Sequence, residues 1–543
     1  MPRRLLTAVA ALVTVVSLSA QQRAPQNESI RADELRADLF FLAGDAMRGR
    51  LTDTVENRAT ADYIRSRFER IGLKPAAAGN SYFQNYNLMA ATLADGNAIE
   101  VGSGDGPKRR LQHGQEFYPQ RFSASGRAAG PVVFAGFGIT APRWTYDDYN
   151  GDVKGKIVLV LDHEPGERDA NSTFEGVVTA EAAATWRKAL AAQEKGAAAI
   201  LFVSDVHNHP GPVNFEQAAR NTWPEAPPHL VTYTLAAWAD RIHIPAAQIS
   251  PALAESLVSG TGKTLAELAA SAETPRGFAP LALPGARVDL QTAVNRHTIP
   301  DRNVVGLLEG SDPKLKDEWV IVSAHFDHNG ADGTQIFNGA DDNGSGTVAL
   351  LEIADAYALA AQQGQRPRRS VLFAAWNSEE RGLLGAWAYT EQPLAPLSTI
   401  AAVLNMDMIG RNEEIQVGGG GRFNGFEVQT AESNNNALNV MGFTRAVEVT
   451  TAIDRANAGI GLDLKKRYDN NPSNLVRRSD QWPFLQRGVP ALGFMTGLHP
   501  DYHTVYDRPE KINYVKMEKI ARLIHQASWD LANAPTRPKT TAR

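Results

Sequence analysis

Four apolar segments of the sequence each lead into side chains that can bind metal ions or transfer protons. The segments and the residues that follow them are 319–324 with His325 and Asp327, 370–376 with Glu379 and Glu380, 400–405 with Asp407, and 491–496 with His499 and His503. Each segment has the length and composition of a buried strand. Ligands bind outside the carboxyl ends of strands in open α/β sheets, so we expect these side chains to meet at one edge of a sheet. One polar strand end would mean little because loops are solvated, but four with metal-binding side chains favour a site.

A fifth acidic segment, 341–346, lies between the first of these strands and a predicted helix that starts at Thr347. It contains Asp341, Asp342 and two glycines, which allow the backbone to turn tightly and bring a carboxylate inward. Acidic residues are also favourable at the N-terminus of a helix. A helix cap needs only one Asp, so the pair favours an additional role at the site.

This set of side chains suits a site for two divalent metal ions. Two ions ~3.5–4 Å apart need a shared carboxylate and further His and carboxylate ligands. Activation of a water molecule needs a base that is not itself a ligand. Of the adjacent residues Glu379 and Glu380, one could be a ligand and the other the base, because neighbours on a loop point in different directions. Asp327 is on the same side of an extended chain as His325, so it could accept a hydrogen bond from that imidazole and fix the ring.

The other histidines carry weaker evidence for metal binding. Most are more simply explained as surface or hydrogen-bonded residues. His207 and His209 lie in a predicted loop and could bind adventitious metal, while His328 and His499 could shape the pocket. The chain has no cysteine, so any zinc must be held by His, Asp and Glu.

Predicted strands and helices alternate along the second half of the chain, and these elements must position the site residues. From Asn303 onward this alternation implies an α/β fold, with a mixed, mostly parallel, doubly wound sheet and helices on both faces. The predicted strands are 304–308, 319–324, 370–376, 400–405 and 491–496, and the predicted helices are 347–359, 383–390, 480–486 and 517–531.

The sequence pattern changes near residue 118, and this change indicates a second, inserted domain. Short β-branched runs bounded by glycines indicate strands at 131–134 and 156–162, and 205–230 is expected to be a loop because it is rich in Pro, Asn and His. The length of the chain also favours more than one domain. The predicted division is a signal peptide at 1–20, the first part of the main domain at 27–117, a smaller β-rich α/β domain at 118–285, the rest of the main domain at 286–535, and a disordered tail at 536–543.

The first twenty residues have the pattern of a secretory signal. Arg3 and Arg4 precede an apolar run at 5–18, and small residues follow. The run is shorter than the ~20 apolar residues of a membrane-spanning helix. We therefore expect export to the periplasm or the extracellular space, with no stable membrane insertion after signal removal. The balance of 55 basic and 60 acidic residues, without a basic tract, argues against nucleic acid as a partner.

Five motifs, in order, resemble those of the M28 family of dizinc peptidases. They are His325-x-Asp327, Gly-Ala-Asp-Asp-Asn-Gly-Ser-Gly at 339–346, Ser-Glu-Glu-x-Gly-Leu-x-Gly at 378–385, Asn-Met-Asp-Met-Ile-Gly at 405–410, and Asp501-Tyr502-His503. Gly49-Arg50 and 72–75 are similar to the opening of that family, and 149–160 with 195–197 resembles a protease-associated domain. The resemblance thus covers nearly all of the chain after the signal and implies the zinc-peptidase fold.

The resemblance also implies metal ligands. Two Zn²⁺ ions would be bound, one by His325 and Asp407 and the other by Glu380 and His503. Asp342 would bridge the two ions.

It implies roles for further residues as well. Asp341 is the nearest competitor for the bridging role. Glu379 would take a proton from the bridging water and pass it to the leaving amine, and Tyr502 would help to hold the oxyanion. Relatives often have Ser-Asp-His where this chain has Ser479-Asp480-Gln481, a difference that affects the substrate wall.

The implied activity is removal of N-terminal residues from peptides, and other activities remain open. A carboxypeptidase of the glutamate-carboxypeptidase type would need Arg residues for carboxylates, and Arg411, Arg477 and Arg478 form no recognisable cluster in the sequence. Relatives that cyclise N-terminal glutamine on one zinc ion usually lack the inserted domain. A metal-free binding protein would have lost a ligand, whereas all five ligands are present.

Overall fold

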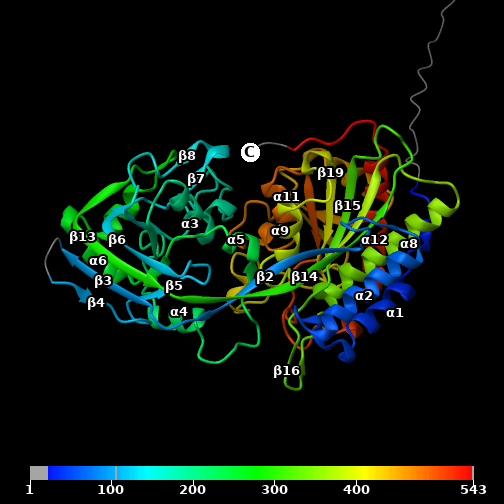
Figure 1. Cartoon of the computed structure of the whole chain (residues 1–543). Helices are drawn as coiled ribbons and strands as arrows, with labels where there is room; N and C mark the ends of the chain where they lie inside the picture. The colour runs from blue at the N-terminus through cyan, green and yellow to red at the C-terminus, as the bar shows by residue number, and fades with distance from the viewer. Residues whose placement is uncertain (1–22, 104–106, 541–543) are drawn as a thin grey trace, which may run out of the picture.

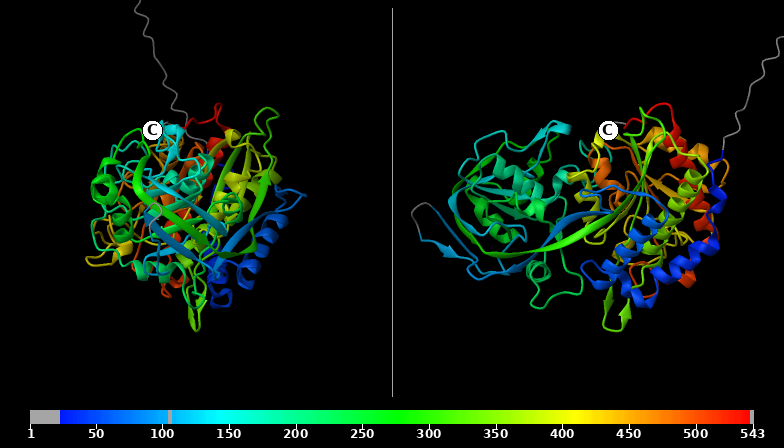
Figure 2. Two further views of the ribbon diagram at one scale, coloured as in Figure 1. Left: turned by 60° about the vertical axis from the view of Figure 1, so that its left-hand side comes forward. Right: turned by 45° about the vertical axis from the view of Figure 1, so that its right-hand side comes forward.

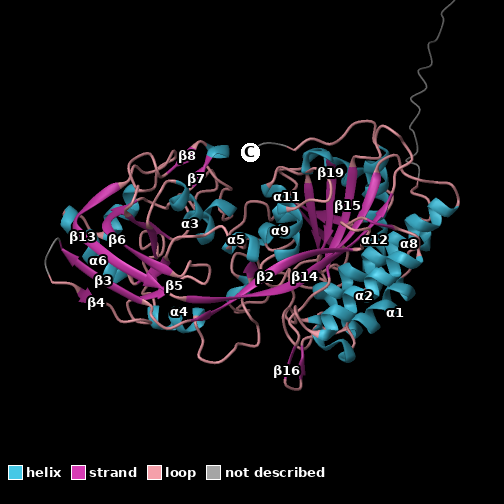
Figure 3. Cartoon of the chain, in the orientation of Figure 1, coloured by secondary structure: helices cyan, strands magenta, loops and turns pink. Residues whose placement is uncertain are grey.

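The computed structural model describes residues 23–103 and 107–540, and it has two lobes that lie side by side (Figure 1). The predicted signal at 1–20 lies outside the described residues. One lobe is built on a large mixed sheet, and the other on a second, smaller sheet. Two long strands, β2 and β14, run from one lobe into the other (Figure 3).

Within the described ranges the main sheet has ten strands. In sheet order these are β11 (Thr234–Leu235), β2 (Phe83–Leu93), β14 (Val294–Leu308), β18 (Ser370–Trp376), β15 (Trp319–His325), β19 (Ile400–Met406), β22 (Ala491–Met495), β20 (Ala437–Met441) and β21 (Asp463–Lys465), with β1 (Lys74–Pro75) beside β14. The strands β18, β15, β19 and β22 are parallel to one another, and the strands next to this group pair antiparallel to it. The α/β fold class is confirmed, and the parallel part of the sheet is its centre.

The central strands are buried on both faces because helices cover both sides. Every residue of β18 and β19 is buried, as near-continuous apolar strands of this kind require. One face is covered by α1 (Ala32–Leu42), α2 (Val55–Arg70), α8 (Gly346–Gln362), α10 (Val447–Asn457) and α12 (Tyr514–Asn533), and the other by α5 (Ala236–Ala239), α9 (Leu384–Glu391) and α11 (Gln481–Gln486).

The long helix α12 shows how the sequence dictates this packing. The side chain of Asn513 caps its N-terminus by accepting a hydrogen bond from the backbone N–H of Lys516. Met517, Ile520 and Ile524 recur at intervals of three and four residues, are fully buried, and pack against the sheet. The predicted helix at 517–531 is therefore part of a longer one.

The second sheet forms the core of the other lobe. In sheet order its strands are β4 (Arg109–Arg110), β3 (Ala98–Ser103), β13 (Leu281–Thr292), β6 (Gly126–Phe134), β9 (Ile157–Leu161), β10 (Ala199–Val203), β12 (Ala246–Ile249) and β5 (Phe117–Pro119). Its helices are α3 (Thr185–Glu194), α4 (Phe215–Thr222), α6 (Pro251–Val258) and α7 (Leu265–Ser271), and a short hairpin pairs β7 (Thr140–Ala141) with β8 (Tyr146–Asp147). Another short hairpin, of β16 (Ala331–Asp332) and β17 (Gln335–Ile336), belongs to the main lobe (Figure 1).

The structure differs from the sequence predictions at several places. Helix α4 lies inside the segment 205–230, which was expected to be a loop, because its apolar residues pack on Tyr118. The second sheet extends past 118 and 285 on both sides, since β3, β4 and the end of β13 pair within it. Residues 536–540, part of the predicted tail, have no helix or strand, but Thr540 Oγ1 donates a hydrogen bond to Gly488 O at 2.8 Å.

The two lobes share an apolar core, and the right-hand view of Figure 2 shows them side by side. Trp186 of α3 stacks on Trp238 at 4.3 Å, and Trp238 meets Trp387 of α9 edge-on at 5.9 Å. A buried ion pair between Glu175 in one lobe and Arg445 in the other also connects the lobes. Loss of this much apolar contact would be costly, so the lobes form one packed unit. No helix within the described ranges is long and apolar enough to cross a membrane.

Candidate metal centre

The carboxyl ends of the parallel strands bring the predicted site residues together. His325 is the last residue of β15, Glu379 and Glu380 follow β18, Asp407 follows β19, and His503 lies in the loop after β22. Neighbouring parallel strands end at the same edge of a sheet, which is the physical reason for this convergence.

Asp342 lies in the turn just before α8 and forms a first group with His325 and Asp407. His325 Nε2 is 3.4 Å from Asp342 Oδ1 and 3.4 Å from Asp407 Oδ1. Ligand atoms around a tetrahedral zinc ion with bonds of ~2.0–2.1 Å are separated by about 3.3 Å. All three side chains are buried. The spacing of their ligand atoms therefore fits one metal ion.

The other oxygen of Asp342 reaches a second group. His503 Nε2 lies 2.9 Å from Asp342 Oδ2 and 3.1 Å from Glu380 Oε2. His328 joins this group, with Nδ1 2.7 Å from Glu380 Oε1 and 3.8 Å from Asp342 Oδ2. Among the described residues, Asp342 is common to both groups. A carboxylate that faces two ligand groups is what a pair of neighbouring ions requires.

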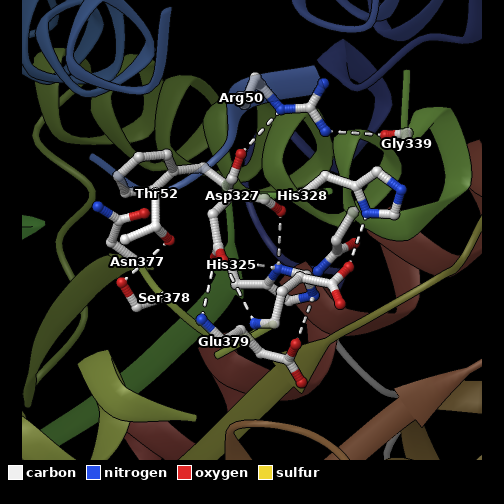
Figure 4. Close-up of polar contacts among 12 residues, drawn as sticks. Arg50, Thr52, His325, Asp327, His328, Gly339, Asn377, Ser378 and Glu379 are labelled. Atoms are coloured by element: carbon white, nitrogen blue, oxygen red, sulfur yellow. Dashed lines mark hydrogen bonds and ion pairs between the residues drawn. The ribbon is translucent and has the colours of Figure 1, made fainter. Parts of the chain in front are cut away.

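Sequence reasoning missed His328 as a candidate ligand. Alternation along an extended chain places it on the side opposite to His325. In the structure β15 ends at His325, so the alternation does not continue and the ring of His328 turns into the site (Figure 4). The signal that could have found it is the His-x-Asp-His spacing of residues 325–328.

The site concentrates negative charge. The carboxylates of Asp342, Glu379, Glu380 and Asp407 are all largely buried. Over residues 23–103 and 107–540, no Lys or Arg forms an ion pair with any of them. Among the described residues, Nε2 of the buried His328 has no hydrogen-bond partner. Because burying uncompensated charge is costly, this donor set fits divalent cations.

The two adjacent glutamates have opposite electrostatic environments. Burial raises the pKa of Glu379 well above its usual range; Asp407 adds to the shift and His325 opposes it. Burial would also raise the pKa of Glu380, but contacts with His503 and His328 lower it well below its usual range. Neighbouring carboxyls with pKa values pushed apart are suited to different roles. Glu380 suits a ligand, and Glu379 suits a group that accepts and releases a proton.

Tyr502 is placed beside the second group. Its ring stacks on His503, with centroids 3.8 Å apart. Its hydroxyl oxygen accepts a hydrogen bond from Arg478 at 3.2 Å. Burial raises the pKa of Tyr502 well above its usual range, so the phenol keeps its proton and can donate a hydrogen bond.

Asp327 holds the glutamate loop in place. Its carboxylate accepts the backbone N–H groups of Glu379 at 3.0 Å and Glu380 at 3.3 Å. His325 Nδ1 lies 3.3 Å from the backbone oxygen of Asp327 and 3.6 Å from Oδ1. Asp327 is therefore in contact with the imidazole, and it also orients the loop after β18.

A second network supports the same loop. Ser378 has a φ of 58°, a left-handed conformation that is unfavourable for a residue with a side chain. Ser378 Oγ donates to Asp301 Oδ2 at 2.5 Å, and Asn377 Nδ2 donates to Asp301 Oδ1 at 2.5 Å. Thr52 Oγ1 lies 3.1 Å from Ser378 Oγ (Figure 4). These hydrogen bonds hold the strained turn that aims Glu379 and Glu380 at the site.

Arg50 connects the two segments that carry the ligands. Its buried guanidinium donates to four backbone carbonyl groups at 2.8–2.9 Å, those of Leu42, Phe326, Asn338 and Gly339. Phe326 follows His325, and Gly339 precedes the turn of Asp342. Figure 4 shows the contact of Arg50 with Gly339. Burial lowers the pKa of Arg50 to about 10. Arg50 is therefore a positioning residue for the metal site.

Replacement of Arg50 by Lys is expected to lower the free energy of unfolding by about 3 kcal/mol or more. The ammonium group of Lys cannot donate to four carbonyl groups as the planar guanidinium does. Each buried carbonyl group left without a donor costs about 1–3 kcal/mol. Urea unfolding measures the change. Arg58→Lys, at an exposed ion pair with Asp53, is the matched control and should change stability by less than about 0.5 kcal/mol. Equal stability of the two variants would contradict the role of Arg50.

Two residues near the site, Asp341 and Gln481, have structural roles in this conformation. Asp341 is turned away from both ligand groups: its Oδ1 accepts the backbone N–H of Gly410 at 2.6 Å, and its Oδ2 lies 3.2 Å from His499 Nε2. Gln481 is buried, and its Nε2 donates to Val476 O at 2.7 Å. Neither Asp341 nor Gln481 faces the ligand groups.

A cleft between the lobes leads to the glutamate loop and Tyr502. It has a volume of about 830 Å³ and is lined from both lobes, with Glu379, Glu380 and Tyr502 on one wall. A smaller cavity of about 30 Å³ lies beside Glu379 and Asp407. Its apolar lining consists of Met408, Met441, Leu475, Met495 and Leu498.

Comparison with known proteins identifies the two lobes. Residues 303–528 match the family model of peptidase family M28, and residues 128–257 match that of the PA domain. The chain contains an M28 peptidase domain and a PA domain. The resemblance that the motifs indicated is thereby confirmed. All the predicted ligands lie in the M28 domain, and the PA domain is inserted between β2 and β14.

The similar proteins are distant relatives. Probable glutamate carboxypeptidase AMP1 of Arabidopsis thaliana is 26% identical over 487 residues, which are 84% of this chain and 61% of that protein. Leucine aminopeptidase 2 of Trichophyton equinum is 26% identical over 334 residues, 56% of each protein. An aminopeptidase structure from Aneurinibacillus sp. strain AM-1 aligns with a TM-score of 0.48 at 17% identity, covering 95% of this chain and 97% of that chain. The chain spans at most about three fifths of the length of these two curated relatives.

Proposed function

We propose that this protein is a dizinc aminopeptidase that removes N-terminal residues from peptides. The observation that carries the proposal is the sharing of Asp342 by two ligand groups, beside a buried Glu379 that belongs to neither group. An M28 peptidase domain supports peptide hydrolysis as the reaction class.

The ligands proposed for one zinc ion are His325, Asp342 and Asp407, and those for the other are Asp342, Glu380 and His503. His328 is close enough to Glu380 to orient it or to join it as a ligand. When bound, the two ions would polarise the substrate carbonyl and lower the pKa of a water molecule.

Glu379 is proposed as the general base and acid. It would accept a proton from the attacking water and pass it to the leaving amine, for which a raised pKa is suitable. Tyr502 would donate a hydrogen bond to the oxyanion of the tetrahedral intermediate, because its protonated hydroxyl lies at the same wall of the cleft.

The cavity beside Glu379 supports an N-terminal residue as the group that is removed. Its carboxylates, from Glu379 and Asp407, can accept hydrogen bonds from a free α-amine. Its apolar side chains, among them Met441, Leu475 and Met495, form a wall beside these carboxylates against which a hydrophobic side chain could pack. Methionines adapt to different shapes, which suits several apolar residues.

A second candidate is a carboxypeptidase for peptides with an acidic C-terminal residue. Arg477 and Arg478 both line the cleft, and within the described ranges neither forms an ion pair with a carboxylate. Guanidinium groups without a carboxylate partner could bind a substrate carboxylate. Arg411, by contrast, is paired with Asp501 at 2.9 Å.

A kinetic panel separates these two functions. Amino-acid p-nitroanilides with a free amine should be hydrolysed, with apolar residues preferred, and their N-acetylated forms should not. Efficient release of C-terminal glutamate from N-blocked peptides, without hydrolysis of the anilides, would support the carboxypeptidase instead.

We further propose that the chain is exported. The support is the signal-like pattern at residues 1–20. Peptides are the proposed partners, and nucleic acid is not. Comparing the N-terminal residue of the protein from a culture supernatant or periplasmic fraction with that of the full chain tests this proposal.

A further inference from the structure

A group of three metal-binding side chains lies in the PA domain, apart from the M28 ligands. It consists of His163, Glu167 and His209, whose ligand atoms all lie within 4.8 Å of one another. His163 Nδ1 is 2.9 Å from Glu167 Oε2, and His209 Nε2 is 2.5 Å from Glu167 Oε1. The two imidazole centroids are 4.3 Å apart, so both rings converge on the same carboxylate.

The backbone at His163 is held in an unfavourable conformation. Its φ is 64°, in the left-handed region that favours glycine. The carbonyl oxygen of His163 accepts a hydrogen bond from the buried ammonium of Lys188 at 2.5 Å, and Lys188 also donates to Leu161 O at 2.7 Å. The end of β9 is thus fixed from the interior, and the ring of His163 is aimed outward toward Glu167.

The two loops that carry the group are tied to each other. One side chain, Glu273, accepts hydrogen bonds from the backbone N–H of Gly166 at 2.7 Å and from Asn208 Nδ2 at 2.6 Å. Asp205 accepts the backbone N–H groups of His207 and Asn208 at 3.0 Å and 3.3 Å. The loop segments 163–167 and 205–209 therefore hold their positions without an ion, which lowers the entropic cost of binding one.

The types of ligand atom in this group determine which class of cation it can bind. Two imidazole nitrogens and one carboxylate are ligands that late first-row divalent ions prefer, whereas Ca²⁺ and Mg²⁺ prefer oxygen alone. Zinc accepts three protein ligands of this kind with one further position open. Binding would require each imidazole nitrogen to separate from its Glu167 oxygen to about 3.3 Å, a movement of less than about 1 Å from the observed contacts of 2.9 and 2.5 Å.

The group of His163, Glu167 and His209 lies beside the cleft between the lobes. His163 lines the cleft between the lobes, on the PA side, together with Trp186 and Trp238, and the opposite wall holds Glu379 and Glu380. The imidazoles of His163 and His209 are each 43% exposed, whereas Glu167 is 12% exposed. An ion there would be reachable from solvent and from the cleft.

We infer that His163, Glu167 and His209 form a third metal site, which binds Zn²⁺ or a similar divalent ion on the PA-domain wall of the cleft. The ion joins the loops 163–167 and 205–209. Its fourth position, left open by three protein ligands, is available to water or to a carboxylate that enters the cleft. This site is independent of the proposed peptidase reaction.

Zinc content of the full chain tests the inference. Metal-free protein is equilibrated with micromolar Zn²⁺, passed through gel filtration and analysed by mass spectrometry for zinc per chain. Wild-type protein should hold one more zinc ion than His163→Ala or His209→Ala. His207→Ala is the matched control, since His207 is exposed two residues from His209 and lies outside the group, and it should match the wild type. The thermal midpoint of the wild type should also rise more with Zn²⁺ than that of His209→Ala.

Two results would overturn the inference. One is equal zinc content in wild type and His209→Ala, and the other is a difference that appears only at millimolar Zn²⁺, which would mean adventitious binding. A failure of the M28 metal site would lower the zinc content of all four proteins alike and leave the difference of one ion unchanged. Thermal unfolding of the metal-free proteins shows whether each variant is folded.

Discussion

Glu379→Gln is expected to lower kcat by about 10²–10⁴-fold while the zinc content stays the same. The amide keeps the size and the hydrogen-bonding capacity of the side chain but cannot accept a proton from water. Glu379 belongs to neither ligand group, so removal of its charge should leave both ions bound. Turnover of an amino-acid p-nitroanilide and zinc per chain, measured on one sample, give both numbers.

The control for this variant is Glu432→Gln, the same change at an exposed position outside the five motifs. Its kcat should equal that of the wild type within a factor of about two, since exposed substitutions have small effects. If Glu379→Gln retained full turnover, Glu379 could not be the base. If it lost a zinc ion, Glu379 would have to be reassigned as a ligand.

Asp342→Asn should have a comparably large effect for a different reason. Asp342 faces both ligand groups, so weakening it should reduce the zinc content from two ions at this site to one or none. Changes to groups that merely orient ligands cost about 10–100-fold, so kcat/KM should fall by more than about 10²-fold. Zinc analysis and anilide kinetics measure the two effects.

The same substitution should also lower the stability of the metal-free protein. Burial and Glu380 would raise the pKa of Asp342, but contacts with His325 and His503 lower it below its usual range, so the folded chain favours the charged carboxylate. Metal-free Asp342→Asn should therefore be less stable than metal-free wild type near neutral pH, and zinc should no longer stabilise it to the same extent. Thermal unfolding with and without zinc measures this.

Asp341→Asn is the matched control, because the neighbouring side chain is also buried but is turned toward Gly410. The amide oxygen can still accept that N–H, so two zinc ions should remain bound. If Asp341→Asn lost zinc and Asp342→Asn kept it, the assignment of the bridging residue would be reversed.

The sequence was sufficient to predict which residues meet, because parallel strands end at one edge of a sheet. The strands before His325, Glu379 and Asp407 were placed to within one residue. The choice between Asp341 and Asp342 could not be made from residue types, since both are aspartates on one turn. It depends on backbone geometry, which directs Asp341 to Gly410 and Asp342 to the ligands.

Other parts of the site depend on contacts between segments far apart in the chain. Arg50 lies more than 270 residues from Phe326 in sequence, and nothing in the local pattern shows that its guanidinium reaches four carbonyls. His209 and Glu167 are joined only by the folding of the PA domain. Strands β2 and β3 were also not predicted, because their stability comes from pairing with β14 and β13 and not from local propensity.

The most direct test of a two-metal aminopeptidase is the activity of metal-free protein during zinc titration, with leucine p-nitroanilide as substrate. The proposed function predicts no hydrolysis after chelation, recovery as zinc is restored to the M28 ligands, and no hydrolysis of the N-acetylated substrate at any zinc concentration. Undiminished hydrolysis by metal-free protein, or no activity with two or more zinc ions bound, would contradict it.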